Sequence, residues 1–186
     1  NAASRSALQT TVNNYYANLT AAQAWFETYT GSGMHGYDNK SFPQVSTSTD
    51  YLTITYYDNY LFRSLTTGLS YVTNDYTNQP AENSGVKGLV TGTKVNVLGS
   101  YTYLYAATYY DTKYRVVQTI SQNIRNATDR VSNKYDFPGR VIETVSTHNN
   151  GTTSYTTKRR MEYDHASRLK KVFHKFSTEP EILLVE

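Results

Sequence analysis

Three aspartates in the C-terminal half of the chain share one local context, which makes them the first candidates for chemistry. Each follows a tyrosine and precedes an arginine by four residues, in segments 110–116, 135–141 and 163–169. Carboxylates can serve as general acids or bases. An active site, however, needs one constellation of different groups, whereas these three are equivalent. The repetition instead favours turns, in which an Asp carboxylate accepts hydrogen bonds from the backbone N–H groups that follow it.

The other catalytic patterns in the sequence lack the context that their chemistry needs. Residues 31–36 match G-x-G-x-x-G, but they follow an expected helix and precede a polar turn, the reverse of a dinucleotide site. The four histidines form no i,i+4 pair and have no neighbouring ligand cluster, and the chain has no cysteine. We therefore expect a protein that is not an enzyme, with no catalytic residues, no metal site and no cofactor.

The spacing of the three segments indicates a repeat array. Their starts lie 25 and 28 residues apart, a range typical of one supersecondary unit stacked on its neighbours. Each unit is expected to be a hairpin whose turn begins after the tyrosine. The structural turn residues are then Tyr110, Asp111, Arg115, Tyr135, Asp136, Gly139, Arg140, Tyr163, Asp164 and Arg168.

The middle turn carries the strongest local signal, because residues 137–140 place Pro138 and Gly139 at the central positions of a type II turn. Tyr114 and Ser167 occupy the place of Gly139 in the other two copies. A left-handed conformation would strain both residues, so we expect those turns to differ in type or to carry a bulge. A degenerate fourth copy is expected at residues 57–63.

The strands that leave these turns also repeat. Aliphatic or aromatic residues stand one and five places after each arginine, with a long polar residue between them, and period-two alternation places all three on one face. The loops that return the chain include residues 148–152, whose Asn-Gly pair is a strong hairpin signal, and the matching residues 122–126. The sequence therefore predicts a mainly β fold, a continuous antiparallel meander.

The N-terminal residues differ in kind. Apolar residues recur at helical spacing behind Ser4 and Ser6, and Thr20 is a candidate cap for a second short helix over residues 21–27. We expect a helical insertion over residues 1–30 and a single β region over residues 31–186, with long loops at 31–50 and 74–87. Trp25 and Phe26 either stack on a ligand such as a sugar or dock the short helix onto a sheet, and the docking patch is the commoner use of such a stripe.

Charge is unevenly distributed along the chain. Residues 1–100 carry 5 Lys and Arg against 6 Asp and Glu, whereas residues 101–186 carry 13 against 9. The basic runs at 158–160 and 170–175 are either a surface for an anionic partner, such as nucleic acid or an acidic glycan, or solvated and edge positions. Acidic residues interrupt these runs, and exposed Lys and Arg discourage sheet aggregation, so we expect solvated or edge positions and no nucleic-acid partner. No apolar run is long enough for a membrane span. The chain begins without Met, so any targeting signal is expected upstream.

On these residues the chain resembles the YD repeats of the RHS (rearrangement hotspot) proteins. Residues 88–98 together with 101–117 are similar to the large RHS-repeat proteins of Bacteroidetes, and the resemblance covers residues 51–186 best. It implies an internal section of a longer, secreted or cell-surface protein, whose strip of hairpins forms a β-shell that encloses or delivers a C-terminal effector, often a toxin. The implied partners are the flanking repeats of the same chain and that cargo.

A second hypothesis treats the chain as a binding module. Its tyrosine-rich strand faces, or the loops at Trp25 and at residues 74–85, would then present stacking platforms to surface carbohydrates or proteins.

Overall fold

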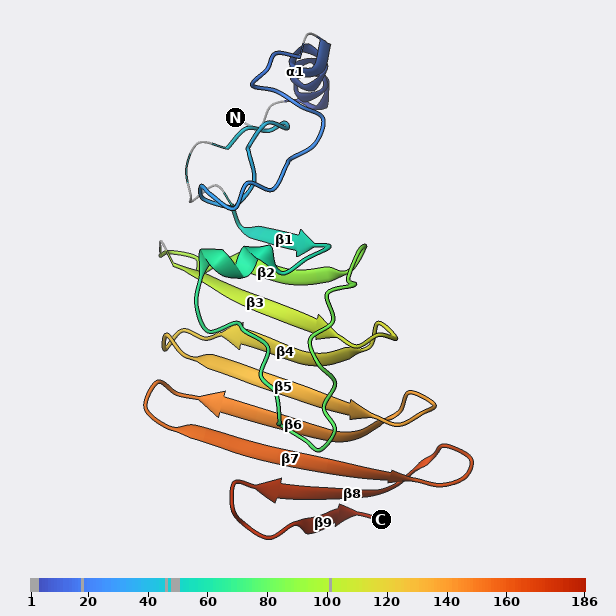
Figure 1. Ribbon diagram of the computed structural model, residues 1–186. Helices are drawn as coiled ribbons and strands as arrows, with labels where there is room; N and C mark the ends of the chain where they lie inside the picture. The colour runs from blue at the N-terminus through green and yellow to red at the C-terminus, as the bar shows by residue number, and fades with distance from the viewer. Residues whose placement is uncertain (1–3, 18, 46, 48–50, 101) are drawn as a thin grey trace. The chain divides into compact units, whose positions relative to one another are not determined.

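The computed structural model describes residues 4–17, 19–45, 47, 51–100 and 102–186 (Figure 1). Its contacts divide the chain into unit 1, Asn1–Leu52, and unit 2, Thr53–Glu186. This boundary lies further along the chain than the one expected at residue 30, because the loop after residue 30 contacts earlier residues of unit 1. The Tyr15 hydroxyl donates to the Lys40 carbonyl at 2.7 Å, and Glu27 accepts hydrogen bonds from Ser41.

Unit 1 contains helix α1, Arg5–Ala17, and a polar loop. Ser4 caps the helix as expected, with its hydroxyl accepting the Ala7 N–H at 3.2 Å. The second helix predicted over residues 21–27 is wrong, since these residues form turns and bends. Thr20 instead bonds through its backbone N–H and hydroxyl to the Gln23 side chain at 3.1 Å. These bonds close a single turn rather than starting a helix.

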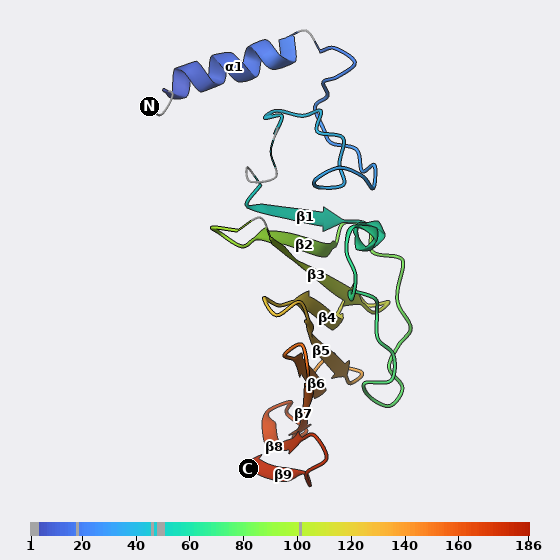
Figure 2. The same ribbon diagram turned by 90° about the vertical axis from the view of Figure 1, so that its left-hand side faces the viewer.

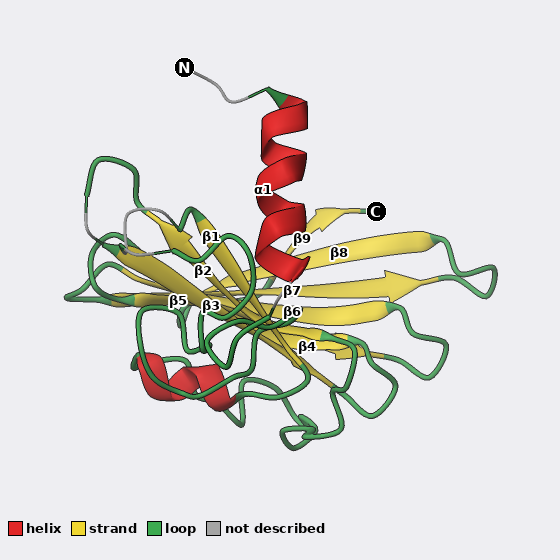
Figure 3. Cartoon of the chain, turned by 90° about the horizontal axis from the view of Figure 1, so that it is seen from above, coloured by secondary structure: helices red, strands yellow, loops and turns green. Residues whose placement is uncertain are grey.

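Unit 2 confirms the predicted meander. Its described residues form one antiparallel sheet of nine strands, each paired with its neighbours in the sequence (Figure 1). The strands are β1 Thr53–Tyr57, β2 Val90–Asn96, β3 Tyr103–Tyr110, β4 Val116–Gln122, β5 Thr128–Tyr135, β6 Val141–Asn149, β7 Ser154–Tyr163, β8 Leu169–Phe176 and β9 Ile182–Val185. Figure 3 shows their directions rotating progressively along the sheet, the usual twist of β-structure.

One insertion covers part of one face of this sheet, over β2 to β6 (Figures 1 and 2). Residues 59–87, between β1 and β2, include the 3-10 helix η2, Leu61–Leu65, and lie on a single side of the sheet (Figure 2). The insertion buries Phe62, Leu69 and Val86, each with 2% of its surface exposed or less. On the sheet, the buried residues facing it include Ala107, Tyr109, Gln118, Ile120, Ser132 and Val145. The core of unit 2 therefore lies between a loop and a sheet.

The expected face pattern is correct in part. Gln118 and Ile120 share the covered face and are buried, and Glu143 and Val145 do the same in β6. The strict alternation is interrupted near the start of each outgoing strand, where the register shifts by one residue opposite Tyr110, Tyr135 and Tyr163. The aliphatic residue directly after each arginine therefore stands outside the regular pattern.

Candidate functional site

The three Tyr-Asp segments form hairpin turns of one geometry. In the first, the Asp111 N–H donates to the Arg115 carbonyl and the Tyr114 N–H donates to the Asp111 carbonyl, both at 3.0 Å. The Asp111 carboxylate accepts the N–H groups of Lys113 at 2.8 Å and Arg115 at 3.0 Å through Oδ1, and the Arg115 side chain at 2.6–2.7 Å through Oδ2. Each of these aspartates therefore closes its own turn.

The backbone pattern repeats at Asp136 and Asp164, although the residue at the left-handed position differs. Gly139 has φ 99°, but Tyr114 at 62° and Ser167 at 63° adopt the same hand. The first alternative expected for the turns without glycine, a different turn type, is therefore wrong, whereas the second, a bulge, is correct, because the strand register shifts at Tyr110 and Tyr163 as it also does at Tyr135. The middle turn also begins at Asp136, whose carbonyl accepts the Gly139 N–H at 3.1 Å, so it is a three-residue loop ending in a left-handed residue rather than the expected type II turn. In the other two copies, the hydrogen bonds between the aspartate and the arginine hold Tyr114 and Ser167 in the left-handed conformation that glycine adopts more easily.

These hydrogen bonds set the charge state of the carboxylates. Burial by itself would raise the pKa of Asp111, but the N–H groups and guanidinium of Arg115, with the Lys113 N–H, lower it below its ordinary value. At Asp136 the same opposition, with Arg140 as the main partner, also lowers the pKa. The backbone N–H of Arg168 is the largest cause lowering the pKa of Asp164. All three carboxylates are thus held in the ionised form that suits an acceptor.

Successive turns are coupled by a repeated set of contacts. The hydroxyl of the tyrosine that opens each turn donates to the carbonyl of the residue that begins the strand after the preceding turn: Tyr110 to Val90 at 2.6 Å, Tyr135 to Val116 at 2.9 Å and Tyr163 to Val141 at 2.9 Å. The guanidinium groups form a second set. Arg115 lies 4.6 Å from the ring centroid of Tyr135, and Arg140 lies 4.8 Å from that of Tyr163. Together these contacts run from one hairpin turn to the next along the ends of the strands. We call this set of contacts the turn row.

The turn row includes a fourth copy that is split by the insertion. The Asp58 N–H donates to the Leu89 carbonyl at 3.2 Å, and its carboxylate accepts the Gly88 N–H at 2.6 Å. Gly88, with φ 78°, takes the left-handed position of Gly139. The expected fourth copy over residues 57–63 is therefore correct only in its first two residues. Arg63 instead contacts Glu82 at 3.0 Å and the Tyr109 hydroxyl at 3.1 Å.

Asp75 anchors the insertion to the sheet. Its carboxylate accepts hydrogen bonds from Arg130 Nε at 2.8 Å and Nη2 at 2.7 Å, and from the Ser132 hydroxyl at 2.5 Å. Gln118 reaches the same carboxylate at 3.1 Å and also binds the backbone of Val72 through both ends of its amide. Only 9% of the Asp75 side chain is exposed. This buried polar network is satisfied by its own members, so it fixes the position of the loop.

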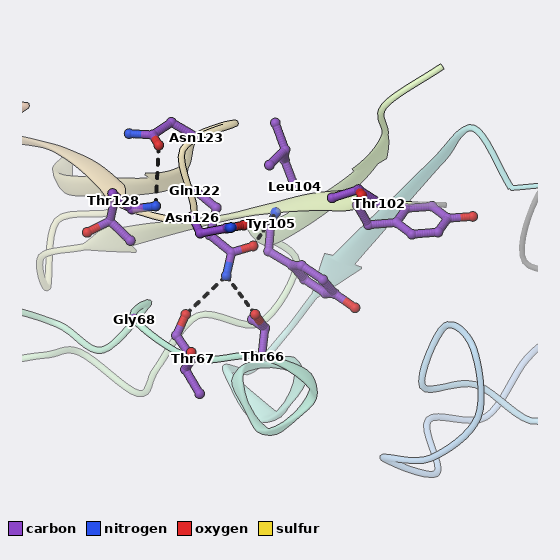
Figure 4. A pocket seen from close by; sticks show the side chains of 12 residues that line it. Thr66, Thr67, Gly68, Thr102, Leu104, Tyr105, Gln122, Asn123, Asn126 and Thr128 are labelled. Atoms are coloured by element: carbon purple, nitrogen blue, oxygen red, sulfur yellow. Dashed lines mark hydrogen bonds between the residues drawn. The ribbon is translucent and has the colours of Figure 1, made fainter. Parts of the chain in front are cut away.

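A polar cleft of about 340 Å³ lies at the end of the sheet away from the turn row (Figure 4). The Gln122 amide spans it, donating to the Thr66 hydroxyl at 2.6 Å and the Thr67 carbonyl at 3.1 Å. The other lining groups include Tyr103, Tyr105, Asn126 and Thr128. Among the described residues that line this cleft none is acidic or basic, so its chemistry suits a neutral ligand that bears hydroxyl groups.

Trp25 and Phe26, the predicted stacking residues, lie in unit 1 and are 65% and 70% exposed. Trp25 stacks on Tyr16 with ring centroids 3.9 Å apart and an interplanar angle of 8°. Trp25 and Phe26 do not lie on a helix, so they cannot dock a short helix onto the sheet as expected. Ligand binding by these two side chains remains a prediction.

Three of the six Lys and Arg side chains in the basic runs 158–160 and 170–175 form ion pairs among the described residues. Lys158 binds Glu143 at 2.7 Å, Arg160 binds both Glu162 at 2.5 Å and Glu181 at 2.7 Å, and Lys171 binds Glu186 at 2.7 Å. Within the described ranges, no group of three or more His, Cys, Asp or Glu side chains is placed to hold a metal ion. Helix α1 is too short and too polar to cross a bilayer, and the part of the chain that the structure describes has no other candidate.

Comparison with protein-family models, with curated proteins and with solved structures finds no match to this chain. Sequence reasoning missed the split repeat and the Asp75 anchor. The sequence signal for the split repeat was Gly88, which stands two residues before Val90, just as Gly139 stands two residues before Val141.

Proposed function

We propose that this chain is a non-enzymatic structural section of a secreted YD-repeat protein of the RHS type, and that its hairpins are part of a β-shell that encloses or delivers an effector. The observation that carries the proposal is the turn row. Its tyrosine hydroxyl and arginine contacts join each hairpin to the next, in the way that a stacked repeat array requires.

The chemistry of the aspartates supports a structural role. The Oδ1 and Oδ2 atoms of Asp111, Asp136 and Asp164 are all engaged by their own turns. A carboxylate in this state is a poor general base, because proton transfer would first have to break the bonds that hold the hairpin. The split copy also shows that the array accepts a long insertion at a turn, because β1 and β2 pair with the same one-residue register shift as the strands at the complete turns.

The polar cleft of Figure 4 favours a second candidate, a binding module for surface carbohydrates or proteins. Tyrosine rings beside hydroxyl and amide groups are the usual lining of a site for a neutral sugar. The two candidate functions depend on different features. A section of a β-shell requires a sheet that continues into its neighbours, whereas a binding module requires only the cleft.

Cryo-electron microscopy of the protein encoded by the full reading frame tests the strip. We expect β9, which has only β8 as a neighbour among the described strands, to be followed by a further hydrogen-bonded strand of a curved, continuous sheet. A separate, closed domain with both sheet edges covered by loops would contradict the proposal and favour the module.

A further inference from the structure

A second cleft, at the turn-row side of the insertion, differs in chemistry from the one in Figure 4. It has a volume of about 340 Å³ and lies between the insertion and the first complete turn. Its lining residues come from four segments: Tyr76, Asn78 and Pro80 from the insertion, Asp111, Thr112, Lys113 and Arg115 from the turn, Val117 from β4, and Lys134 and Tyr135 from the end of β5. We call it the basic cleft.

The basic cleft has an excess of positive charge. Arg115 is balanced by Asp111, to which it is bound at 2.6 Å. Lys113 and Lys134 have no acidic side chain within ion-pair distance among the described residues. Glu143 stands opposite Lys134 in the sheet, but its carboxylate is bound to Lys158. Two ammonium groups therefore share this cleft with no carboxylate to neutralise them.

Aromatic rings hold these cations in place of carboxylates. The Lys134 ammonium lies 5.9 Å from the ring centroid of Tyr76, and the Lys113 ammonium lies 4.9 Å from that of Phe137. The hydroxyls of Tyr76 and Tyr135 are committed to backbone carbonyls. Tyr76 is buried, with 7% of its surface exposed, and Arg115 lies over the ring of Tyr135, so these two tyrosines offer a ligand only the ring edges that line the cleft and no free hydroxyl.

We propose that the basic cleft binds an acidic saccharide, a sugar ring that carries a carboxylate. Lys113 and Lys134 supply the charge for the carboxylate, the half-buried ring of Pro80 and the accessible edge of Tyr135 supply apolar surface for the sugar ring, and the exposed Asn78 amide supplies hydrogen bonds for hydroxyl groups. The volume accommodates one sugar ring and part of a second. This site does not depend on the strip, because a continuous sheet and an isolated module would both carry it.

Nuclear magnetic resonance titration of the chain with D-glucuronic acid tests the proposal, with D-glucose and inorganic phosphate as parallel probes. We expect glucuronate to shift amide signals of residues 76–78, 111–115 and 134–135 in a saturable manner, and to bind more weakly as NaCl is raised. Glucose at the same concentration should leave these signals unchanged. Phosphate binding more tightly than glucuronate would overturn the assignment to a saccharide.

Substitution separates the cleft from general surface charge. Lys113→Gln with Lys134→Gln should weaken glucuronate binding about tenfold or more. Lys87→Gln with Lys170→Gln, which removes the same charge from exposed positions outside the cleft, should change it less than twofold. Lys113→Arg with Lys134→Arg should retain binding, which guards against a fold defect in the glutamine variant. Absence of saturable shifts, or equal weakening by both glutamine pairs, would overturn the proposal.

Discussion

Replacing Asp75 with Ala should detach the insertion from the sheet. The substitution removes the acceptor of four hydrogen bonds, two of them from the Arg130 guanidinium, and leaves that cation without its partner. Because 9% of the Asp75 side chain and 22% of the Arg130 side chain are exposed, the pair is nearly buried. The loss is therefore much larger than for an ion pair on the surface.

The size of the effect follows from the geometry. Removing one partner of a buried ion pair costs about 3–5 kcal/mol. Arg130 retains some access to water, so we take the lower end, about 3 kcal/mol, a large fraction of the roughly 5–15 kcal/mol that stabilises a typical domain. With a urea dependence of about 2 kcal/mol/M, the midpoint should fall by about 1.5 M. Asp75→Asn should cost less, since the amide oxygen still accepts.

The assay must report on unit 2. The chain has one tryptophan, Trp25, which lies in unit 1, so tryptophan fluorescence would follow the wrong part of the molecule. Circular dichroism of the sheet and of its tyrosines during urea unfolding is the suitable signal. Glu179→Ala, at an exposed position, is the control and should change the free energy of unfolding by no more than about 0.5 kcal/mol. An Asp75→Ala change as small as the control would refute the anchoring role.

Three further predictions concern the turns and the face under the insertion. Tyr114→Gly should stabilise unit 2 by up to about 1 kcal/mol, because the left-handed strain that it releases, about 1–2 kcal/mol, exceeds the conformational entropy that glycine loses on folding. Gly139→Ala should destabilise unit 2 by about 1–2 kcal/mol in the same urea melts, because it introduces that strain. Gly92→Ala should cost about 1–3 kcal/mol or more, since the new methyl group would overlap the Phe62 ring; an unchanged midpoint would show that the ring does not pack there. The turn carboxylates have folded-state pKa values below the ordinary value of about 3.9. They therefore stabilise the fold above that pH, and this stabilisation is lost as the pH falls through the lower folded-state values. The urea midpoint should drop from pH 5 to pH 3, and it should drop less in Asp111→Asn.

Much of unit 2 could be predicted because its signals are local and repeated. The position of each Asp after a Tyr marks where a strand ends, and the Asn-Gly pair at Asn150 marks another turn, whose Gly151 has φ 95°. The turn types could not be read from single residues. Tyr114 and Ser167 disfavour a left-handed conformation, but several hydrogen bonds to one carboxylate outweigh that preference.

The insertion shows the limit of local reasoning. Its attachment depends on pairs distant in the chain, such as Asp75 with Arg130 and the Leu69 carbonyl with the Tyr109 hydroxyl, and no spacing rule connects them. The split repeat was hidden for the same reason, because its Asp58 and Gly88 are separated by 29 residues, 59–87. In unit 1, the helix predicted over residues 21–27 does not form, because the hydrogen bonds between Thr20 and Gln23 close a single turn.

The most direct test of the repeat strip is to duplicate one repeat inside the chain. A second copy of residues 136–163, inserted between Tyr163 and Asp164, carries two strands with the Asp136 turn before them and the Asn150 turn between them, and it rejoins the sheet at an equivalent Tyr-Asp step. We predict a soluble protein whose urea midpoint is not lowered and whose urea dependence rises by roughly a fifth, in proportion to the surface that the added strands bury. A lowered midpoint, aggregation, or an unchanged urea dependence with the extra copy unfolded would contradict the account, because it would show that the sheet has a fixed number of strands.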